Sequence, residues 1–265
     1  MKKGIIAIDL DGTLLDAGGV YSSRTREYLR RLSAEGYLIV LASGRPYRSM
    51  KHIYEDLGCN APVICYNGSL VFHPLDASFP AFETRFKAGS LRNVLSRCQE
   101  YLLSYMAETD QRIFLDKDDL FLSRYFPYTG MEFAYGDGPD VIVEDTFTLL
   151  LNCPIGLHPR LKEDCEMEEG IAWRAWSNAT YSELYIPSAH KGTALTYIMK
   201  QYGIDPKDVY AFGDAENDIP MLDVVGYPYA MKNNRVPSLM NRFPQTKYSV
   251  DEDGVLEALS EVIKL

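Results

Sequence analysis

The stretch GIIAIDLDGT, residues 4–13, decides the fold. Its apolar residues predict a buried strand over 4–10, yet Asp9 interrupts the run and Asp11 follows two positions later. Gly12 permits a tight backbone turn directly after the strand. Carboxylates at the end of a buried strand are costly to desolvate unless other groups compensate their charge. We therefore expect cationic groups from elsewhere in the chain to lie near Asp9 and Asp11.

Strand-like and helix-like stretches alternate along both ends of the chain. Apolar runs predict strands over 37–43, 61–67, 208–214 and 225–231, with another near 246–250. Helical patterns cover 22–35, opened by Ser22 or Ser23, 46–57, a segment around 217–224, and 254–264. Continuous apolar strands that alternate with helices predict an α/β fold, a parallel sheet covered on both faces.

The middle of the chain has a different pattern of predicted helices and strands. Apolar residues at helical spacing predict a helix over 90–103, and strand-like runs occupy 112–116, 147–153, 171–177 and 181–186. We interpret residues 83–187 as a smaller α+β domain inserted into a first domain formed by 1–82 and 188–265.

Composition excludes several classes of function. The chain has 265 residues, a net charge of −10 and no basic cluster, so we expect neither a nucleic-acid partner nor a membrane surface. No apolar run reaches the ~18–20 residues of a membrane span, and the short run after Met1-Lys2-Lys3 is too short for a secretory signal. Five cysteines without CxxC spacing indicate free thiols and a cytoplasmic location, and four scattered histidines argue against a zinc site.

Four polar stretches follow strands or open helices, where ligands bind in open parallel sheets. They are the turn 9–13, Ser43-Gly44-Arg45, Lys191 in the first turn of a helix that Ser188 could cap, and GDAEND, residues 213–218. A helix start can also hold an anion with its free N–H groups. If these stretches converge, their acids call for a divalent cation, and oxygen ligands alone favour Mg²⁺ over zinc.

Each stretch alone has a plainer interpretation. Lys191 could be an exposed lysine, GDAEND a helix cap with spare acids, and Arg45 and Asn67 surface or turn residues. An EF-hand that starts at Asp9 would need Gly at residue 14 and Glu at residue 20, which are Leu and Val. Ser188 and Lys191 match the SxxK of penicillin-recognising enzymes, but no SDN or KTG follows, and both GxGxxG and GxxxxGK[ST] are absent.

Taken in order, DLDGT, Ser43, Lys191 and GDAEND resemble the haloacid dehalogenase (HAD) superfamily of phosphohydrolases. The insert, preceded by YNGS at 66–69, is similar to the Cof-type branch with its α+β (type IIB) cap. The resemblance implies a Rossmann-like catalytic core and a cap that closes over the site and contacts the leaving group. Two departures are Asn234, where the family commonly has Ala, and the KYSVDEDGV stretch, which lacks a usual threonine.

The resemblance also assigns the catalytic groups. Asp9 would attack phosphorus and form an aspartyl-phosphate, and Asp11 would protonate the leaving oxygen and then activate water. Because Asp11 must be protonated first, we expect burial and neighbouring acids to raise its pKa. Mg²⁺ would be held by Asp9, the Asp11 carbonyl and Asp214, with Asp218 in or next to its coordination shell. Lys191 would neutralise charge and orient Asp9.

Other residues are expected to contact the substrate. Thr13 would hold the acid or the phosphoryl group, Ser43 and Gly44 would bind phosphoryl oxygens, and Asn217 would contact phosphate or fix Lys191. Arg45 and Asn67 are candidates for substrate contact. Aromatic residues of the insert, more often core than ligand-binding, could grip a ring or sugar; they are Phe114, Phe121, Tyr125, Phe126, Tyr128, Trp173 and Trp176.

The sequence thus predicts a Mg²⁺-dependent phosphatase of small phosphate monoesters, such as sugar phosphates, active as a monomer or small homo-oligomer. Two alternatives stay open. A phosphomutase or phosphotransferase would use the same nucleophile with a sugar acceptor, and a non-catalytic sensor would only bind a phosphorylated ligand. The Asp9/Asp11 pair argues against the sensor, which needs no nucleophile.

Overall fold

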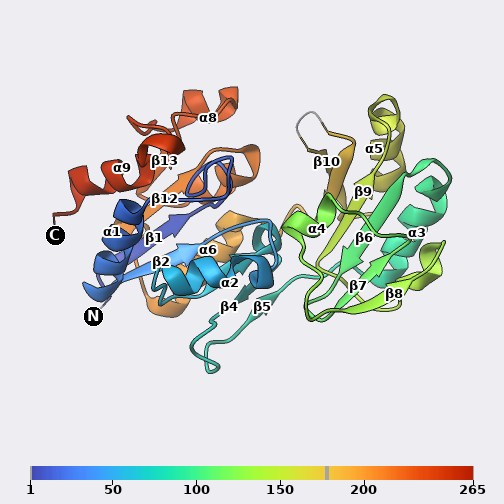
Figure 1. The fold of residues 1–265 in the computed structure, drawn as a ribbon, viewed down its shortest axis with the longest axis horizontal. Coiled ribbons are helices and arrows are strands. Elements are labelled where there is room, and N and C mark those ends of the chain that lie inside the picture. The colour runs from blue at the N-terminus through green and yellow to red at the C-terminus, as the bar shows by residue number, and fades with distance from the viewer. Residues whose placement is uncertain (1, 177–178, 265) are drawn as a thin grey trace. The chain divides into compact units, whose positions relative to one another are not determined.

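The computed structural model describes residues 2–176 and 179–264. The chain forms two compact units (Figure 1). The first combines Met1–Phe82 with His190–Leu265, and the second is Glu83–Ala189. Each unit is described by itself.

The first unit is built on a parallel sheet with the strand order β13-β12-β1-β2. Its strands are β1 (Gly4–Ile8), β2 (Tyr37–Leu41), β12 (Val209–Gly213) and β13 (Tyr227–Ala230). All three strand pairs are parallel, so the carboxyl ends of the strands meet at one edge. The predicted α/β fold is confirmed.

Helices cover this sheet. They are α1 (Ser23–Ala34), α2 (Tyr47–Asp56), α6 (Lys191–Tyr202), α7 (Ile219–Leu222), α8 (Pro237–Arg242) and α9 (Gly254–Val262). Alternate strand residues such as Ala7 and Val40 pack in one core with Leu195 of α6 and Leu222 of α7. Helix α1, which the Ser22 side chain caps as predicted, packs against β2 and α9. The carboxyl edge therefore rests on a rigid, buried framework.

The predicted third strand over 61–67 is shorter than expected. Strand β3 (Val63–Cys65) pairs with β4 (Leu70–Phe72) in a separate three-stranded sheet completed by β5 (Phe82–Glu83). A single parallel bridge between Ala42 and Ile64 connects β3 to the end of β2. Tyr66 and Asn67 both have a positive φ, which ends the strand.

The second unit is an α+β domain with a six-stranded sheet in the order β10-β11-β9-β6-β7-β8. Its strands are β6 (Ser104–Glu108), β7 (Arg112–Leu115), β8 (Glu132–Tyr135), β9 (Thr148–Asn152), β10 (Ala172–Ala175) and β11 (Tyr181–Tyr185). Neighbouring strands are antiparallel except β7 and β8. Helices α3 (Ala88–Cys98) and α5 (His158–Glu166) supply side chains to its core, and α4 (Leu122–Tyr125) is short.

Several expectations for local structure were wrong. The helix predicted over 90–103 gives way at Cys98 to a 3₁₀ turn and then to β6. No strand forms over 246–250, and the bridge between Ala230 and Gln245 lies just before this segment. His190, not Ser188, caps α6. Residue 177, the end of one predicted strand, lies outside the described residues.

All five cysteines are buried free thiols, as the sequence predicted. Within the described part of the chain, none of the helices has the length and apolar character needed to cross a membrane.

Candidate active site

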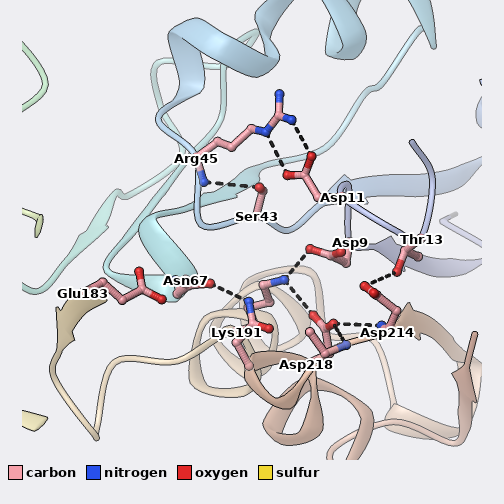
Figure 2. A network of polar contacts seen from close by, with 12 residues as sticks. Asp9, Asp11, Thr13, Ser43, Arg45, Asn67, Glu183, Lys191, Asp214 and Asp218 are labelled. Carbon is pink, nitrogen blue, oxygen red and sulfur yellow. Dashed lines mark hydrogen bonds and ion pairs between the residues drawn. The ribbon is translucent and has the colours of Figure 1, made fainter. Parts of the chain in front are cut away.

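A buried lysine lies at the centre of the polar groups at the carboxyl edge of the parallel sheet (Figure 2). Lys191 is the first residue of α6 and is completely buried. Its Nζ forms ion pairs with Asp9, directly after β1, and with Asp218 Oδ1 at 2.6 Å. The interpretation of Lys191 as an exposed lysine is therefore wrong.

Asp218 organises the GDAEND segment as well as Lys191. Its Oδ2 accepts hydrogen bonds from the backbone N–H groups of Asp214 and Ala215, each at 3.0 Å. Its other oxygen pairs with Lys191. One carboxylate therefore caps the turn, as the plainer interpretation expected, and also anchors the lysine.

Asp214 faces the turn after β1. Thr13 Oγ1 donates a hydrogen bond to Asp214 Oδ1 at 3.2 Å, so Thr13 holds Asp214 rather than Asp11. Gly12 has φ +85°, and a Cβ on it would lie 2.4 Å from Asp214 Oδ2. Glycine is therefore required at residue 12 for both its conformation and its space.

The carboxylates outnumber the cations in this buried cluster. Burial, and next the charge of Asp218, raise the pKa of Asp9 well above its ordinary value despite the opposing effect of Lys191. The same two causes raise the pKa of Asp214 to about 6. Burial acts to lower the pKa of Lys191, but the charges of Asp218 and Asp9 outweigh it and raise the pKa above its ordinary value. The shifts of the two acids thus reflect first their burial and then repulsion between carboxylates that one lysine does not offset.

This imbalance suits a divalent cation. Oxygen atoms of Asp9, Asp214 and Asp218 all lie within 4.8 Å of one another. Three ionised carboxylates and one ammonium leave two uncompensated negative charges, the charge that one divalent ion would neutralise. The donor atoms are all oxygen, which fits Mg²⁺ rather than a softer metal. Because Asp218 already accepts three hydrogen bonds, Asp9 and Asp214 have more coordinating capacity left.

Asp11 lies in different surroundings from those predicted. Its side chain is 49% exposed, so the expected burial is wrong. Arg45 Nε donates to Asp11 Oδ2 at 2.9 Å, and Nη2 pairs with the other oxygen. This two-point contact occupies both carboxylate oxygens of Asp11. Arg45 therefore contacts Asp11, a role that its sequence position did not suggest.

The Ser43-Gly44-Arg45 stretch follows β2 and is held by Asn67. Asn67 N–H donates to the Ser43 carbonyl at 2.9 Å, and a Cβ on Gly44 would lie 3.0 Å from Asn67 Nδ2. Ser43 is buried, and its Oγ accepts a hydrogen bond from Arg45 N–H at 3.2 Å, so its own O–H can point elsewhere. Asn217 Nδ2 donates to Asn67 Oδ1 at 2.9 Å, whereas Lys191 is fixed by the two aspartates.

Sequence reasoning missed two polar residues that support this site. His190 caps α6 by accepting a hydrogen bond from Thr193 N–H on its Nδ1 at 3.2 Å. Asn233 donates from Nδ2 to the Gly12 carbonyl at 2.7 Å. The only signal was the AMKNN stretch at 230–234, where Asn234 departs from the family pattern.

The aromatic residues proposed to grip a substrate lie in three kinds of surroundings. Phe114 and Phe126 are buried in the second unit. Phe121 stacks on Tyr181 with ring centroids 4.5 Å apart and also contacts Tyr125 and Trp176. The remaining two rings pack on neighbours, Tyr128 on Phe133 and Trp173 on His158. Most of these rings thus serve packing.

The chain matches a known protein family along nearly its whole length. The family model of the haloacid dehalogenase-like hydrolases matches residues 6–259. The 5-amino-6-(5-phospho-D-ribitylamino)uracil phosphatase YitU of Bacillus subtilis is 28% identical over 270 residues, which cover 100% of this chain and 99% of that protein. An HMP-PP phosphatase of Escherichia fergusonii is 29% identical, covering 91% and 88%.

Solved structures share the fold. A haloacid dehalogenase-like hydrolase from Bacteroides thetaiotaomicron matches with a TM-score of 0.82 and 23% identity, covering 99% of this chain and 100% of that one. The HAD subclass IIB sugar phosphatase BT4131 matches with a TM-score of 0.80 and 16% identity, covering 97% and 98%. The relatives are phosphatases, and the chain is accordingly an enzyme of the phosphoric monoester hydrolase class. With its core, its inserted cap and a family match along nearly its whole length, the chain belongs to the Cof-type haloacid dehalogenase-like hydrolases.

Proposed function

We propose that this enzyme is a Mg²⁺-dependent phosphatase that hydrolyses small phosphate monoesters through an aspartyl-phosphate on Asp9. The observation that carries the proposal is the buried cluster of Asp9, Lys191, Asp214 and Asp218, which has two negative charges in excess when all three acids are ionised. Such a cluster is costly without a ligand and suits one divalent cation together with a phosphoryl group.

Asp9 is the proposed nucleophile. Its carboxylate lies at the end of a fixed strand, and Lys191 holds one of its oxygens. Attack on phosphorus forms the bond between Asp9 and the phosphoryl group as the bond from phosphorus to the leaving oxygen breaks. Water then attacks the aspartyl-phosphate, and inorganic phosphate and free Asp9 result. Two simpler transfers thereby replace one difficult hydrolysis.

Asp11 is the proposed proton carrier. It gives a proton to the leaving oxygen in the first step and takes one from water in the second. Arg45 holds both carboxylate oxygens of Asp11, so we infer that Arg45 must release Asp11 before the first step. After that release Arg45 would contact the substrate. This exchange gives both residues a role in the same step.

Other groups would hold the phosphoryl oxygens and the metal. Ser43 O–H and the Gly44 amide are the proposed phosphate donors, with Thr13 and Asn217 supporting the loops around them. Asp9, Asp214 and the Asp11 carbonyl would hold Mg²⁺, and Asp218 would lie beside the coordination shell. When bound, Mg²⁺ supplies positive charge that stabilises the transferring phosphoryl group. Residues 83–187 would serve as the cap that selects the substrate.

The test is phosphate release from p-nitrophenyl phosphate and a metabolite panel, with Mg²⁺ or EDTA. The panel includes sugar phosphates, the ribitylaminouracil phosphate and HMP-PP, since relatives are named for the last two. Steady release in Mg²⁺ without a bisphosphate activator, abolished by EDTA, supports the proposal and excludes a mutase. No turnover of any monoester in Mg²⁺ would contradict it and favour the sensor.

A further inference from the structure

Asn233 connects the turn after β1 to the C-terminal part of the chain. It lies in the loop that follows β13 and is partly buried. Its Nδ2 donates to the Gly12 carbonyl at 2.7 Å, and its Oδ1 accepts from the Val250 N–H at 2.9 Å. Both ends of one amide are therefore used to connect two backbone segments.

The bond to Gly12 fixes the backbone directly after Asp11. Gly12 N–H donates to the Leu15 carbonyl at 2.9 Å, and its own carbonyl is held by Asn233. The peptide groups on both sides of Gly12 are thus fixed. Gly12 has a positive φ and no Cβ, so its own conformational preferences restrict it little. The N–H groups of the three residues after Gly12 bond to the Leu10 carbonyl within the turn, and Asn233 adds the hydrogen bond from outside that holds the Gly12 carbonyl.

This restraint matters because Asp11 has little other support. Its side chain is half exposed and paired with Arg45, away from Asp9. A proton donor that moves between two positions by side-chain rotation needs a fixed backbone from which to rotate. A displacement of about 1 Å in a reacting group can reduce the rate by about 10²-fold.

We propose that Asn233 is a positioning residue for Asp11: by holding the Gly12 carbonyl, it sets the backbone from which Asp11 reaches the leaving oxygen. This inference rests on the proposed function. It makes no use of Asn233 as a ligand for metal or phosphate. It predicts a defect in the first step that is confined to substrates whose leaving group must be protonated, because the later attack of water is common to all substrates.

The experiment compares two substrates in Asn233→Asp and Asn233→Ala. Asp keeps an acceptor for Val250 N–H and loses the donor to Gly12, whereas Ala loses both. Agreement between the two variants would exclude the new charge of Asp as the cause. Asn234→Ala is the matched control, because Asn234 Oδ1 is buried without a partner among the described residues and its Nδ2 contacts only the nearby Met231 carbonyl.

The substrates are p-nitrophenyl phosphate, whose leaving group departs without a proton, and the alkyl phosphate hydrolysed fastest in the panel. We expect both Asn233 variants to lose about 10- to 100-fold in kcat/KM on the alkyl phosphate and far less on the aryl one, because kcat/KM reports the step in which the leaving group departs and not the later attack of water. Asp11→Asn should show the same selectivity more strongly, and Asn234→Ala should match wild type.

Equal losses on both substrates, or no loss in folded Asn233 variants, would overturn the positioning role while the wild-type activity upholds the proposed function. Absence of wild-type turnover on both substrates would overturn the proposed function and this inference together. Thermal unfolding and vanadate binding, measured on each variant, separate a general loss of folding from the selective defect.

Discussion

Asp9 and Asp11 are two residues apart, but they belong to two electrically different regions. Asp9 lies in a buried cluster, next to a lysine with no exposed surface and two further acids. Asp11 lies at the surface, in contact with one arginine. Charges in the buried region interact strongly because little water screens them, whereas those of the exposed pair are largely screened. One short turn thus places the proposed nucleophile in a buried, fixed position and the proposed proton carrier at the surface.

The largest expected effect tests the buried side. Asp9→Asn removes the proposed nucleophile and should lower kcat by about 10⁴-fold or more. The variant should be at least as stable as wild type, because it removes one of three mutually repelling acids. Phosphate release and thermal unfolding, measured on the same preparation, check both statements. Near-normal activity would contradict the assignment of Asp9.

The next effect concerns the central cation. Lys191→Met leaves Asp9 and Asp218 buried without their partner, and should lower the free energy of unfolding by about 3–5 kcal/mol when measured in EDTA. It should also weaken vanadate binding in Mg²⁺. Lys207→Met is the matched control, since its exposed side chain pairs weakly with Asp205 and should matter by less than about 0.5 kcal/mol. Equal stability of the two variants would mean that the buried lysine stabilises the protein no more than the exposed one.

A smaller effect is expected on the exposed side. Arg45→Ala breaks the pair with Asp11 and should lower the free energy of unfolding by less than about 1 kcal/mol, because Asp11 stays hydrated. Denaturant unfolding alongside Lys191→Met measures the contrast directly. A loss as large as that of Lys191→Met would mean that the charges at Asp11 are screened no more than those of the buried cluster.

The smallest effect is a pH dependence at the helix that carries Lys191. Burial lowers the pKa of His190, and its Nδ1 must be unprotonated to cap α6. As the pH falls below about 6.5, the unfolded state binds this proton before the folded state does, so folding stability is lost. His190→Asn keeps an acceptor that does not titrate. Wild type should lose stability below that pH more steeply than the variant, by less than about 1 kcal/mol; parallel curves would refute this.

Much of the first unit was predictable because its strands are continuous apolar runs. The stretches 4–10, 37–43 and 208–214 gave β1, β2 and β12, and the order of the strand ends predicted which polar stretches would lie together. The strand expected near 246–250 does not form, because the segment leads into a 3₁₀ helix over Val250–Glu252. A hydrogen bond from Ser249 N–H to the Glu252 side chain stabilises this helix. Strand β6 was missed because apolar residues at helical spacing continue almost to Ser104, where the strand begins.

The candidate site was predictable in its residue types but not in its contacts. Lys191, Asp9 and Asp218 were selected by motif, and the structure brings them together. The pairing of Asp11 with Arg45 was missed, because nothing in either motif indicates that two side chains 34 residues apart will meet. Asn233 and His190 were missed for a related reason: they bind backbone groups, which every residue possesses.

Strand β1 lies between β2 and β12, yet β12 follows it by some two hundred residues and the entire second unit lies between them in the chain. During synthesis on the ribosome, β1 and β2 can pair early, but one edge of β1 stays open until Val209–Gly213 has emerged. An apolar strand with an open edge can pair with other chains. The nascent protein therefore relies on late closure, or on chaperones, to complete the sheet that carries Asp9.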